Sequence, residues 1–260
     1  MVTGEQLEAL KQFDGPTICN ALEFFSLRPK TVGFLKPGIR KIFPTETRVV
    51  GYTATAKVSA IHPPTEDQKR LQEAYYRAVW ETPKPTITVI QDIDPEPIGS
   101  FWGEVQANIH RYLGCAAVIT SGGVRDLDEV FPMGFEYFAS CVLVSHAYVH
   151  LEAVQCPVHV GGITVEPLAI VFADKHGVVL IPEEVVPCLP EACRAAQEAE
   201  YPVIHNCRKV IETSGIPTRT GGIDRLEALM NWRREMGKRR EEATKKFTSL
   251  LLDQKGRSLK

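Results

Sequence analysis

The sequence lacks any long hydrophobic run and any strong excess of one charge. No stretch of its 260 residues approaches the roughly 18 consecutive apolar residues that cross a bilayer. The first residues, MVTGEQLEALKQF, hold no cationic segment followed by an apolar run, so we expect no secretory signal and no membrane association. The formal net charge of -2 excludes a chain that is basic throughout, so we do not expect nucleic acid as a partner, although a local basic patch stays open.

The cysteines lack the spacing of a disulfide framework or a zinc site. There are seven, an odd number, and no C-x-x-C pair occurs. Most stand in apolar stretches, which favours reduced thiols in a cytoplasmic protein. Hydrophobic residues make up 44% of the chain and charged residues 24%, as in folded globular proteins. The length suits one large domain, or one domain with an appendage.

Strand and helix patterns alternate along most of the chain, which predicts a mixed α/β fold. A capping-box pattern, Thr65 followed by Gln68, opens a predicted helix that ends near Glu81. Near the N-terminus we expect two short helices separated by a turn at residues 14–16, with Thr17 as the cap of the second. Further strands are predicted over residues 49–60, 86–90, 116–120, 157–165, 169–173 and 178–181, and further helices over residues 103–113 and 187–200.

The last part of the chain changes character. Residues 225–260 contain eleven Lys and Arg against five Asp and Glu, a net charge of +6. A partial helical stripe of apolar residues begins at Leu226, which favours a solvated helix that packs on the core or on a neighbouring subunit. A contact with an anion or RNA is the alternative, but interleaved aromatic residues are missing. We therefore predict a basic, mainly helical end of the chain.

The strongest local feature joins two segments twenty residues apart. A predicted strand, residues 116–120, runs into the turn Ser121-Gly122-Gly123 and delivers Arg125 and Asp126 side by side. Glu104 stands at the start of a predicted helix, where free backbone N–H groups favour an anion. Asp126 is a hard oxygen ligand suited to Mg²⁺ or Mn²⁺, and Arg125 offers a two-pronged donor to a carboxylate or an enolate. These residues indicate a metal-assisted site for a small anionic oxo acid; a surface salt bridge is the alternative.

The order of these motifs resembles the RraA-like family, which includes the class II 4-hydroxy-4-methyl-2-oxoglutarate/4-carboxy-4-hydroxy-2-oxoadipate aldolases. The family's aldolase pattern is an acid, twenty residues, Arg-Asp, two residues and an acid, which here is Glu104, Arg125, Asp126 and Glu129. The resemblance covers roughly residues 10–205. It implies an α/β fold with a layered β/β/α core of the swivelling type and a catalytic domain over residues 1–205. The basic, mainly helical C-terminal extension over residues 206–260 is longer than the resemblance leads us to expect.

The resemblance also implies a metal site. Asp126 is expected to ligate Mg²⁺ or Mn²⁺ directly, Glu104 through water, and Glu129 as a further acid of the site. In the family another acid comes from the C-terminal helix of a neighbouring subunit; Glu200 is the candidate by its position, and Glu198 is the alternative. A homotrimer or homohexamer is implied by the same resemblance.

The resemblance also implies a substrate-binding site, made by Arg125 and by the start of the predicted helix at residue 103. Arg125 is expected to bind the oxygens of a small 2-oxo acid and to stabilise the enolate of pyruvate. Backbone N–H groups near Gly103, Val105 and Gln106 are expected to receive the carboxylate of the acid. The implied activity is a metal-dependent lyase of the aldolase and oxaloacetate decarboxylase type. The alternatives are a binding protein without catalysis that regulates an RNA-processing enzyme, and a different metal-dependent reaction on a related oxo acid.

Some positions depart from the family pattern or suggest other chemistry. Ser121-Gly122-Gly123 replaces the common Asp-Gly before Arg-Asp, and Asn20 stands where an Asp is usual. These changes leave the metal motif intact but bear on the substrate. His146 and His150 are four residues apart and would share one face of a helix, yet no H-E-x-x-H pattern supports a zinc pair.

Overall fold

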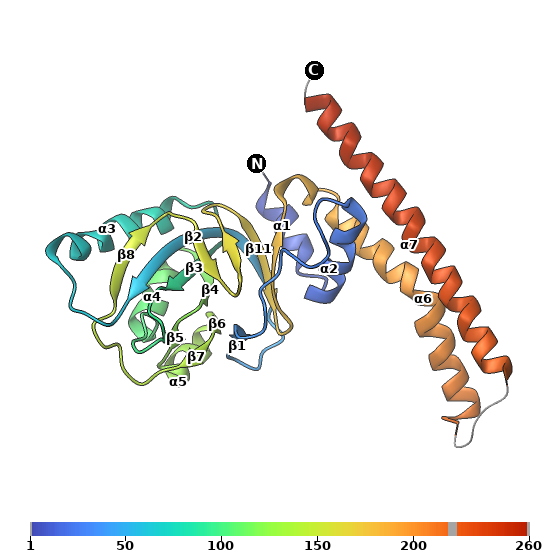
Figure 1. The fold of residues 1–260 in the computed structure, drawn as a ribbon, viewed down its shortest axis with the longest axis horizontal. Helices are drawn as coiled ribbons and strands as arrows, with labels where there is room; N and C mark the ends of the chain where they lie inside the picture. Colours follow the sequence, from blue (N-terminus) through green and yellow to red (C-terminus); the bar gives the residue numbers. More distant parts are fainter. Residues whose placement is uncertain (1, 218–222, 259–260) are drawn as a thin grey trace. The chain divides into compact units, whose positions relative to one another are not determined.

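A computed structural model describes residues 2–217 and 223–258 (Figure 1). The described residues form two compact units. The α/β unit comprises Met1–Gly15 and Thr31–Glu183, and the helical unit comprises Pro16–Lys30 and Glu184–Lys260. Within the described ranges, no helix has both the length and the apolar character needed to cross a membrane.

The α/β unit is built around a mixed sheet, which has eight strands in the described part of the chain (Figure 1). The strand order is β1-β6-β4-β3-β2-β11-β12, and β8 pairs with the second half of the long strand β2. Strands β2, β3, β4 and β6 run parallel, and the remaining pairings are antiparallel. The bounds are β1 (Arg40–Lys41), β2 (Val49–Ser59), β3 (Thr86–Asp92), β4 (Cys115–Thr120), β6 (Glu136–Ala139), β8 (His150–Val154), β11 (Ile170–Asp174) and β12 (Gly177–Ile181).

Both faces of the sheet are buried, which explains why the central strands are apolar at almost every position. One face packs against α3 (Glu66–Glu81), α4 (Glu104–Tyr112) and the short α5 (Leu127–Val130). The other face packs against the hairpin of β9 (Val158–Val160) and β10 (Ile163–Val165). Neighbouring residues of a strand face opposite layers, so that Ile90 joins the helix layer and Val89 the hairpin layer. The predicted layered β/β/α core is confirmed.

Short elements complete the α/β unit. Helix α1 (Gly4–Leu10) begins at a capping box formed by Thr3 and Gln6. Strands β5 (Gly123–Val124) and β7 (Cys141–Val142) pair with each other, and η2 (Phe131–Met133) is a 3₁₀ turn. The 3₁₀ turn η3 (Glu183–Val185) begins at the last residue of this unit.

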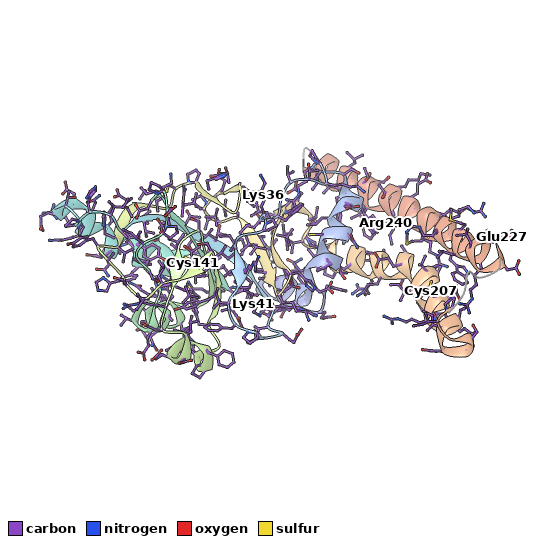
Figure 2. The ribbon with its side chains drawn as sticks, turned by 60° about the horizontal axis from the view of Figure 1, so that its bottom comes forward. Lys36, Lys41, Cys141, Cys207, Glu227 and Arg240 are labelled. Carbon is purple, nitrogen blue, oxygen red and sulfur yellow. The ribbon has the colours of Figure 1, made fainter. Side chains whose placement is uncertain are left out.

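The helical unit is organised around two long helices, α6 (Leu189–Ser214) and α7 (Ile223–Ser258). Helix α2 (Gly15–Leu22) and the turn η1 (Glu23–Phe25) supply further residues of this unit. The ring of Phe247 on α7 packs against Phe24 and Phe25, with ring centroids 6.2 and 5.5 Å apart. Figure 2 labels Arg240 on α7, whose Nη2 lies 3.0 Å from Glu23 Oε2.

Several local predictions are confirmed and others are wrong. The capping box at Thr65 is formed, because Gln68 N donates to Thr65 Oγ1 and Thr65 N donates to Gln68 Oε1. Thr17 does not begin the second helix: α2 starts at Gly15, whose N–H donates to Asp174 Oδ2 at 2.7 Å. A carboxylate distant in sequence thus caps this helix, which the local pattern cannot reveal.

Two further local predictions need correction, and the predicted domain boundary can be located on the structure. His146 and His150 share no helical face, since His146 lies in a loop and His150 begins β8. Residues 157–165 do not form one strand but the hairpin of β9 and β10. The predicted boundary between residues 205 and 206 lies inside the continuous helix α6.

Candidate active site

Arg125 and Asp126 are delivered by the segment that follows β4. After β4, the chain passes through β5 and meets the loop that precedes α4: Trp102 forms a bridge with Val124, and Arg125 N donates to Trp102 O at 3.0 Å. Ser100 reinforces this junction, since its Oγ lies 2.6 Å from Trp102 O and 2.8 Å from Gly123 O. The two halves of the predicted motif therefore meet beyond the carboxyl ends of the parallel strands β3 and β4, where α/β sheets commonly bind ligands.

Asp126 adopts an unusual backbone conformation at this junction. Its φ and ψ angles are 54° and 49°, in the left-handed region that few residues other than glycine, Asn and Asp enter. Its Oδ2 accepts from Glu104 N at 2.8 Å, and its Oδ1 lies 3.7 Å from Arg125 Nε. A side chain at position 103 has no room, because a Cβ on Gly103 would lie 2.4 Å from Asp126 Oδ2. The carboxylate is thereby held against the start of α4.

The first turn of α4 presents further N–H groups. The helical ladder begins with Ala107 N donating to Gly103 O, so the N–H groups of Val105 and Gln106 have no acceptor within the helix. Both residues line a pocket of about 360 Å³, together with Gly103, Arg125 and Asp126. We call these five residues the motif wall. A small carboxylate that enters this pocket meets two free N–H groups and one guanidinium.

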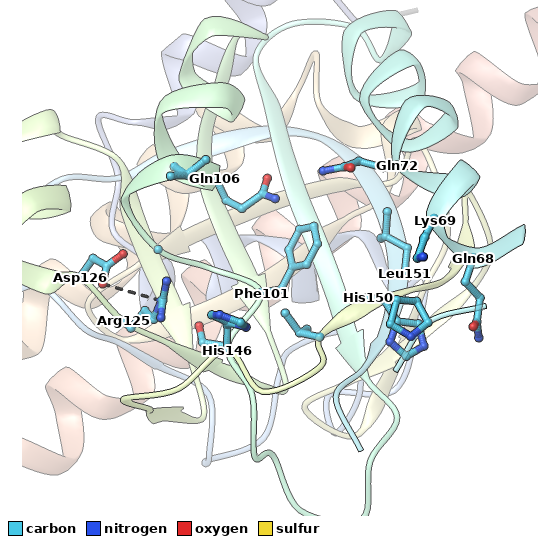
Figure 3. A pocket seen from close by; sticks show the side chains of 15 residues that line it. Gln68, Lys69, Gln72, Phe101, Gln106, Arg125, Asp126, His146, His150 and Leu151 are labelled. Atoms are coloured by element: carbon cyan, nitrogen blue, oxygen red, sulfur yellow. Dashed lines mark ion pairs between the residues drawn. The ribbon is translucent and has the colours of Figure 1, made fainter. Parts of the chain in front are cut away.

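The opposite side of the pocket comes from α3 (Figure 3). Gln68, Lys69 and Gln72, which we call the helix wall, project from its exposed face. A chain of hydrogen bonds joins the two walls, because Gln72 Nε2 lies 3.0 Å from Tyr76 Oη and Tyr76 Oη donates to Gln106 Oε1 at 3.2 Å. The Gln106 oxygen is thus engaged, which leaves its NH₂ group as the donor for a ligand.

A buried histidine ties the walls together below the pocket. His110 of α4 lies with its Nε2 2.8 Å from Tyr75 Oη of α3 and its Nδ1 2.7 Å from Gln106 O. Burial lowers the pKa of His110 to about 4, so the ring is neutral at pH 7. Nδ1–H then donates a hydrogen bond to the carbonyl of Gln106, and Nε2 accepts one from the Tyr75 hydroxyl.

Three of the predicted acids lie apart from the lining of this pocket. Glu104 and Glu129 are exposed, and neither is among the described residues that line it. Glu104 contributes its backbone N–H to Asp126 instead. Glu200 lies on α6 in the helical unit, where its Oε1 accepts from Asn20 Nδ2 at 3.0 Å and lies 3.6 Å from Arg240 Nη1.

The motif wall suits a hard divalent cation that keeps most of its water. Among the described residues, no group of three His, Cys, Asp or Glu side chains converges as a metal site. Asp126 Oδ1 is a single accessible carboxylate oxygen, because Oδ2 is engaged by Glu104 N. Mg²⁺ is commonly held by one or two carboxylates together with water and substrate oxygens, so this donor set fits it.

Sequence reasoning missed the remaining lining residues and one buried acid. His146, Val149, His150 and Leu151 reach the pocket from the segment around the start of β8, and Phe101 lies between the walls. Asp92 at the end of β3 is buried, which raises its pKa to about 6. In the sequence, Asp92 is marked only by its position after a predicted strand. His146 and His150 are marked only by their spacing of four residues, which suggested a shared helical face.

Comparisons with known proteins place the chain in a family. Residues 15–180 match the RraA-like family (Aldolase/RraA). An uncharacterized protein of Methanocaldococcus jannaschii is 25% identical over 209 residues, which cover 77% of this chain and 88% of that protein.

Two solved structures share the fold at 20% identity. An uncharacterized protein from Pseudomonas syringae pv. tomato has a TM-score of 0.63 and covers 88% of this chain and 95% of its own. Streptomyces coelicolor RraAS2, an unusual member of the RNase ES inhibitor RraA protein family, has a TM-score of 0.60 and covers 76% and 93%. Because the family match spans more than half of the sequence, the chain belongs to the RraA-like family.

Proposed function

We propose that this protein is a divalent-metal-dependent lyase that cleaves a small 2-oxo acid through the enolate of pyruvate. The observation that carries the proposal is the meeting of Arg125 and Asp126 with the start of α4 in one pocket. The family includes both lyases and proteins that inhibit an RNase, so membership alone does not decide between them. The proposal therefore rests on the chemistry of the pocket.

Each part of the motif wall has a task in this reaction. The N–H groups of Val105 and Gln106 would receive the carboxylate of the oxo acid, and the Arg125 guanidinium would balance charge that develops on the 2-oxo oxygen. Asp126 would hold Mg²⁺ or Mn²⁺. Glu104, whose backbone N–H donates to Asp126, and Glu129, three residues after Asp126, would act on the ion through water from outside the pocket lining. When bound, such an ion would polarise the 2-oxo group. No lysine Schiff base is required.

The assembly belongs to the same proposal. A homotrimer or homohexamer would bring Glu200 of a neighbouring copy to the site, and closed symmetry would repeat that arrangement in every subunit. The cytoplasmic location expected from the cysteines is also part of it; within the described part of the chain, none of the seven cysteines forms a disulfide.

The proposal is tested by measuring the release of pyruvate in an assay coupled to lactate dehydrogenase. Oxaloacetate and 4-hydroxy-4-methyl-2-oxoglutarate are supplied with Mg²⁺ or Mn²⁺, and the assay is repeated with EDTA and with metal but no enzyme. Enzyme-dependent, EDTA-sensitive pyruvate formation is the expected result. No release from either compound by folded, metal-loaded protein would refute the proposal.

The second candidate is a binding protein that regulates an RNA-processing enzyme. It is favoured by the basic character of residues 225–260, most of which lie on α7. RraAS2, which shares the fold, belongs by name to a family of RNase inhibitors. Under this alternative the protein slows RNA cleavage by its partner and releases no pyruvate, so the same assay separates the two functions.

A further inference from the structure

The loop between β7 and β8 carries an imidazole into the pocket of the motif wall. His146 lines this pocket with Arg125 and Asp126, and Figure 3 draws its ring in the same part of the view as Arg125. Cleavage of a hydroxylated 2-oxo acid requires a group that removes the hydroxyl proton. The residues of the motif wall do not supply one, since Arg125 stays protonated and Asp126 is committed to the cation and to Glu104 N.

The ring of His146 is oriented by its own loop. Its Nδ1 lies 2.7 Å from Ala147 O, and because a carbonyl only accepts, Nδ1 carries the proton. The lone pair of the neutral ring is then on Nε2. Within the described part of the chain, Nε2 has no hydrogen-bond partner. A free ring nitrogen of this kind is the ordinary form of a general base.

The backbone around His146 is constrained by the loop that precedes α4. Ser100 N donates to Ser145 O at 2.9 Å, and Ala147 N donates to Ser145 Oγ at 2.9 Å. Ala147 has a φ angle of 45°, an uncommon conformation that proteins retain where the surroundings enforce it. A Cβ at Gly99 would lie 2.5 Å from His146 O, so the two loops are in close contact. Ser100 therefore positions His146 and also braces the junction that holds Arg125.

We propose that His146 is the general base and acid of the lyase reaction, an assignment that rests on the proposed function. As the bond between C3 and C4 breaks, the proton of the C4 hydroxyl passes to Nε2 and C4 becomes the carbonyl of the leaving product. The electron pair of the broken bond stays with the other fragment as the enolate of pyruvate. His146 then returns the proton to C3, which forms the methyl group of pyruvate and restores the neutral ring.

This assignment predicts different effects on three reactions of one enzyme. Cleavage of 4-hydroxy-4-methyl-2-oxoglutarate needs the base for the hydroxyl proton. Exchange of the methyl protons of pyruvate with D₂O needs the same base in the reverse direction. Decarboxylation of oxaloacetate reaches the same enolate by loss of CO₂ and needs no base for that step, and water can protonate the product.

The experiment measures all three reactions with Mg²⁺ for the wild type and for His146→Gln. We expect aldol cleavage and the proton exchange, followed by NMR, to fall on the order of 10²-fold, while decarboxylation stays close to the wild-type rate. Added imidazole should partly restore both lost activities in His146→Ala, since it supplies a base in the vacated space. The matched control is His159→Gln, because His159 is exposed on β9 and does not line the pocket.

Two results would overturn the assignment while leaving the proposed function in place. One is an exchange rate unchanged in His146→Gln. The other is an equal loss of exchange and decarboxylation without rescue by imidazole, which would make His146 a binding or structural residue. A wild-type protein that releases no pyruvate from either compound would overturn the proposed function itself and this assignment with it.

Discussion

The two walls of the pocket are built in different ways. In the motif wall the backbone sets the geometry: Gly103 leaves no space for a side chain, Asp126 is in a left-handed conformation, and Arg125 N is bonded to Trp102 O. In the helix wall the residues that line the pocket, such as Lys69, belong to a regular helix, in which the backbone N–H and C=O groups bond to one another.

This difference indicates a division of labour. A substitution in the motif wall shifts the carboxylate, the guanidinium and the helix N–H groups relative to one another. A substitution in the helix wall changes one side chain on an exposed helical face. We therefore expect the motif wall to fix the chemistry and the helix wall to select the distal end of the substrate. The predictions below test this contrast from its strongest consequence to its weakest.

The largest effect is expected at Asp126. Asp126→Asn keeps the size of the side chain and a residue type that tolerates the left-handed backbone, but it removes the charge that would hold the cation. Metal-dependent pyruvate release should fall by at least about 10³-fold with the fold intact by circular dichroism. The exposed neighbour Asp128 supplies the control, since Asp128→Asn should act like the wild type. Turnover near the wild-type rate in Asp126→Asn would remove Asp126 from the site.

The next prediction tests whether the motif wall requires the space left by the missing side chain of Gly103 as well as the charge of Asp126. Gly103→Ala would place a Cβ 2.4 Å from Asp126 Oδ2, so the carboxylate must leave Glu104 N. We expect turnover to fall on the order of 10²-fold from this displacement, and stability to fall by about 1–3 kcal/mol in urea unfolding. Gly4→Ala is the matched control, because a Cβ on Gly4 would meet nothing within 4 Å. Full activity in Gly103→Ala would show that the carboxylate position is not critical.

The motif wall was predictable because its residues are tied to local patterns. A strand followed by a glycine-rich turn placed Arg125 and Asp126 after β4, and the helix start placed Glu104 at α4. The alternation of strands and helices predicted a mixed α/β fold, and the layered core was implied by the resemblance to the RraA-like family. The capping box located the first residue of α3 for a similar reason, since both of its partners lie within four residues.

The remaining parts depend on contacts between distant segments. Asp174 caps α2 from β11, and no pattern near Gly15 announces it. The helix wall was missed because α3 was predicted without knowledge of what its exposed face opposes. His146 was considered only with His150 at helical spacing, but the loop before β8 sets its orientation. In each case a tertiary contact determines the role of the residue, and such a contact cannot be predicted from periodicity along the chain.

A smaller effect is expected in the helix wall. Lys69 pairs with Glu66 at 2.7 Å, but both side chains are largely exposed, so this surface pair is weak and leaves Lys69 able to meet a ligand. Lys69→Ala should raise KM about tenfold for an oxo acid with a distal carboxylate and leave kcat nearly unchanged, as expected for loss of one charged hydrogen bond. Arg70→Ala is the control, since Arg70 is exposed on the same helix and does not line the pocket. A fall in kcat without a change in KM would contradict the division of labour.

The buried tie between the walls is expected to have the smallest effect on turnover, and its contribution appears in the pH dependence of stability. The pKa of His110 is lowered from 6.5 to about 4 by burial, so between these pH values the unfolded chain binds a proton that the folded chain does not. Stability must therefore fall as the pH drops from about 6.5 to about 4, by about 3 kcal/mol for this group alone. Asp92 acts in the opposite sense, because its pKa is raised from 3.8 to about 6, and Asp92→Asn removes that contribution.

Urea unfolding at pH 7 and pH 5 separates these contributions. In the Asp92→Asn background, the loss of stability between pH 7 and pH 5 should be larger than in the wild type, because the opposing proton uptake is gone. Adding His110→Gln should then reduce that loss, since no imidazole at position 110 remains to be protonated. If the two variants show the same pH dependence, His110 is not the group that destabilises the folded protein in acid. The contact from Nε2 to Tyr75 would then hold the walls together equally well in both protonation states.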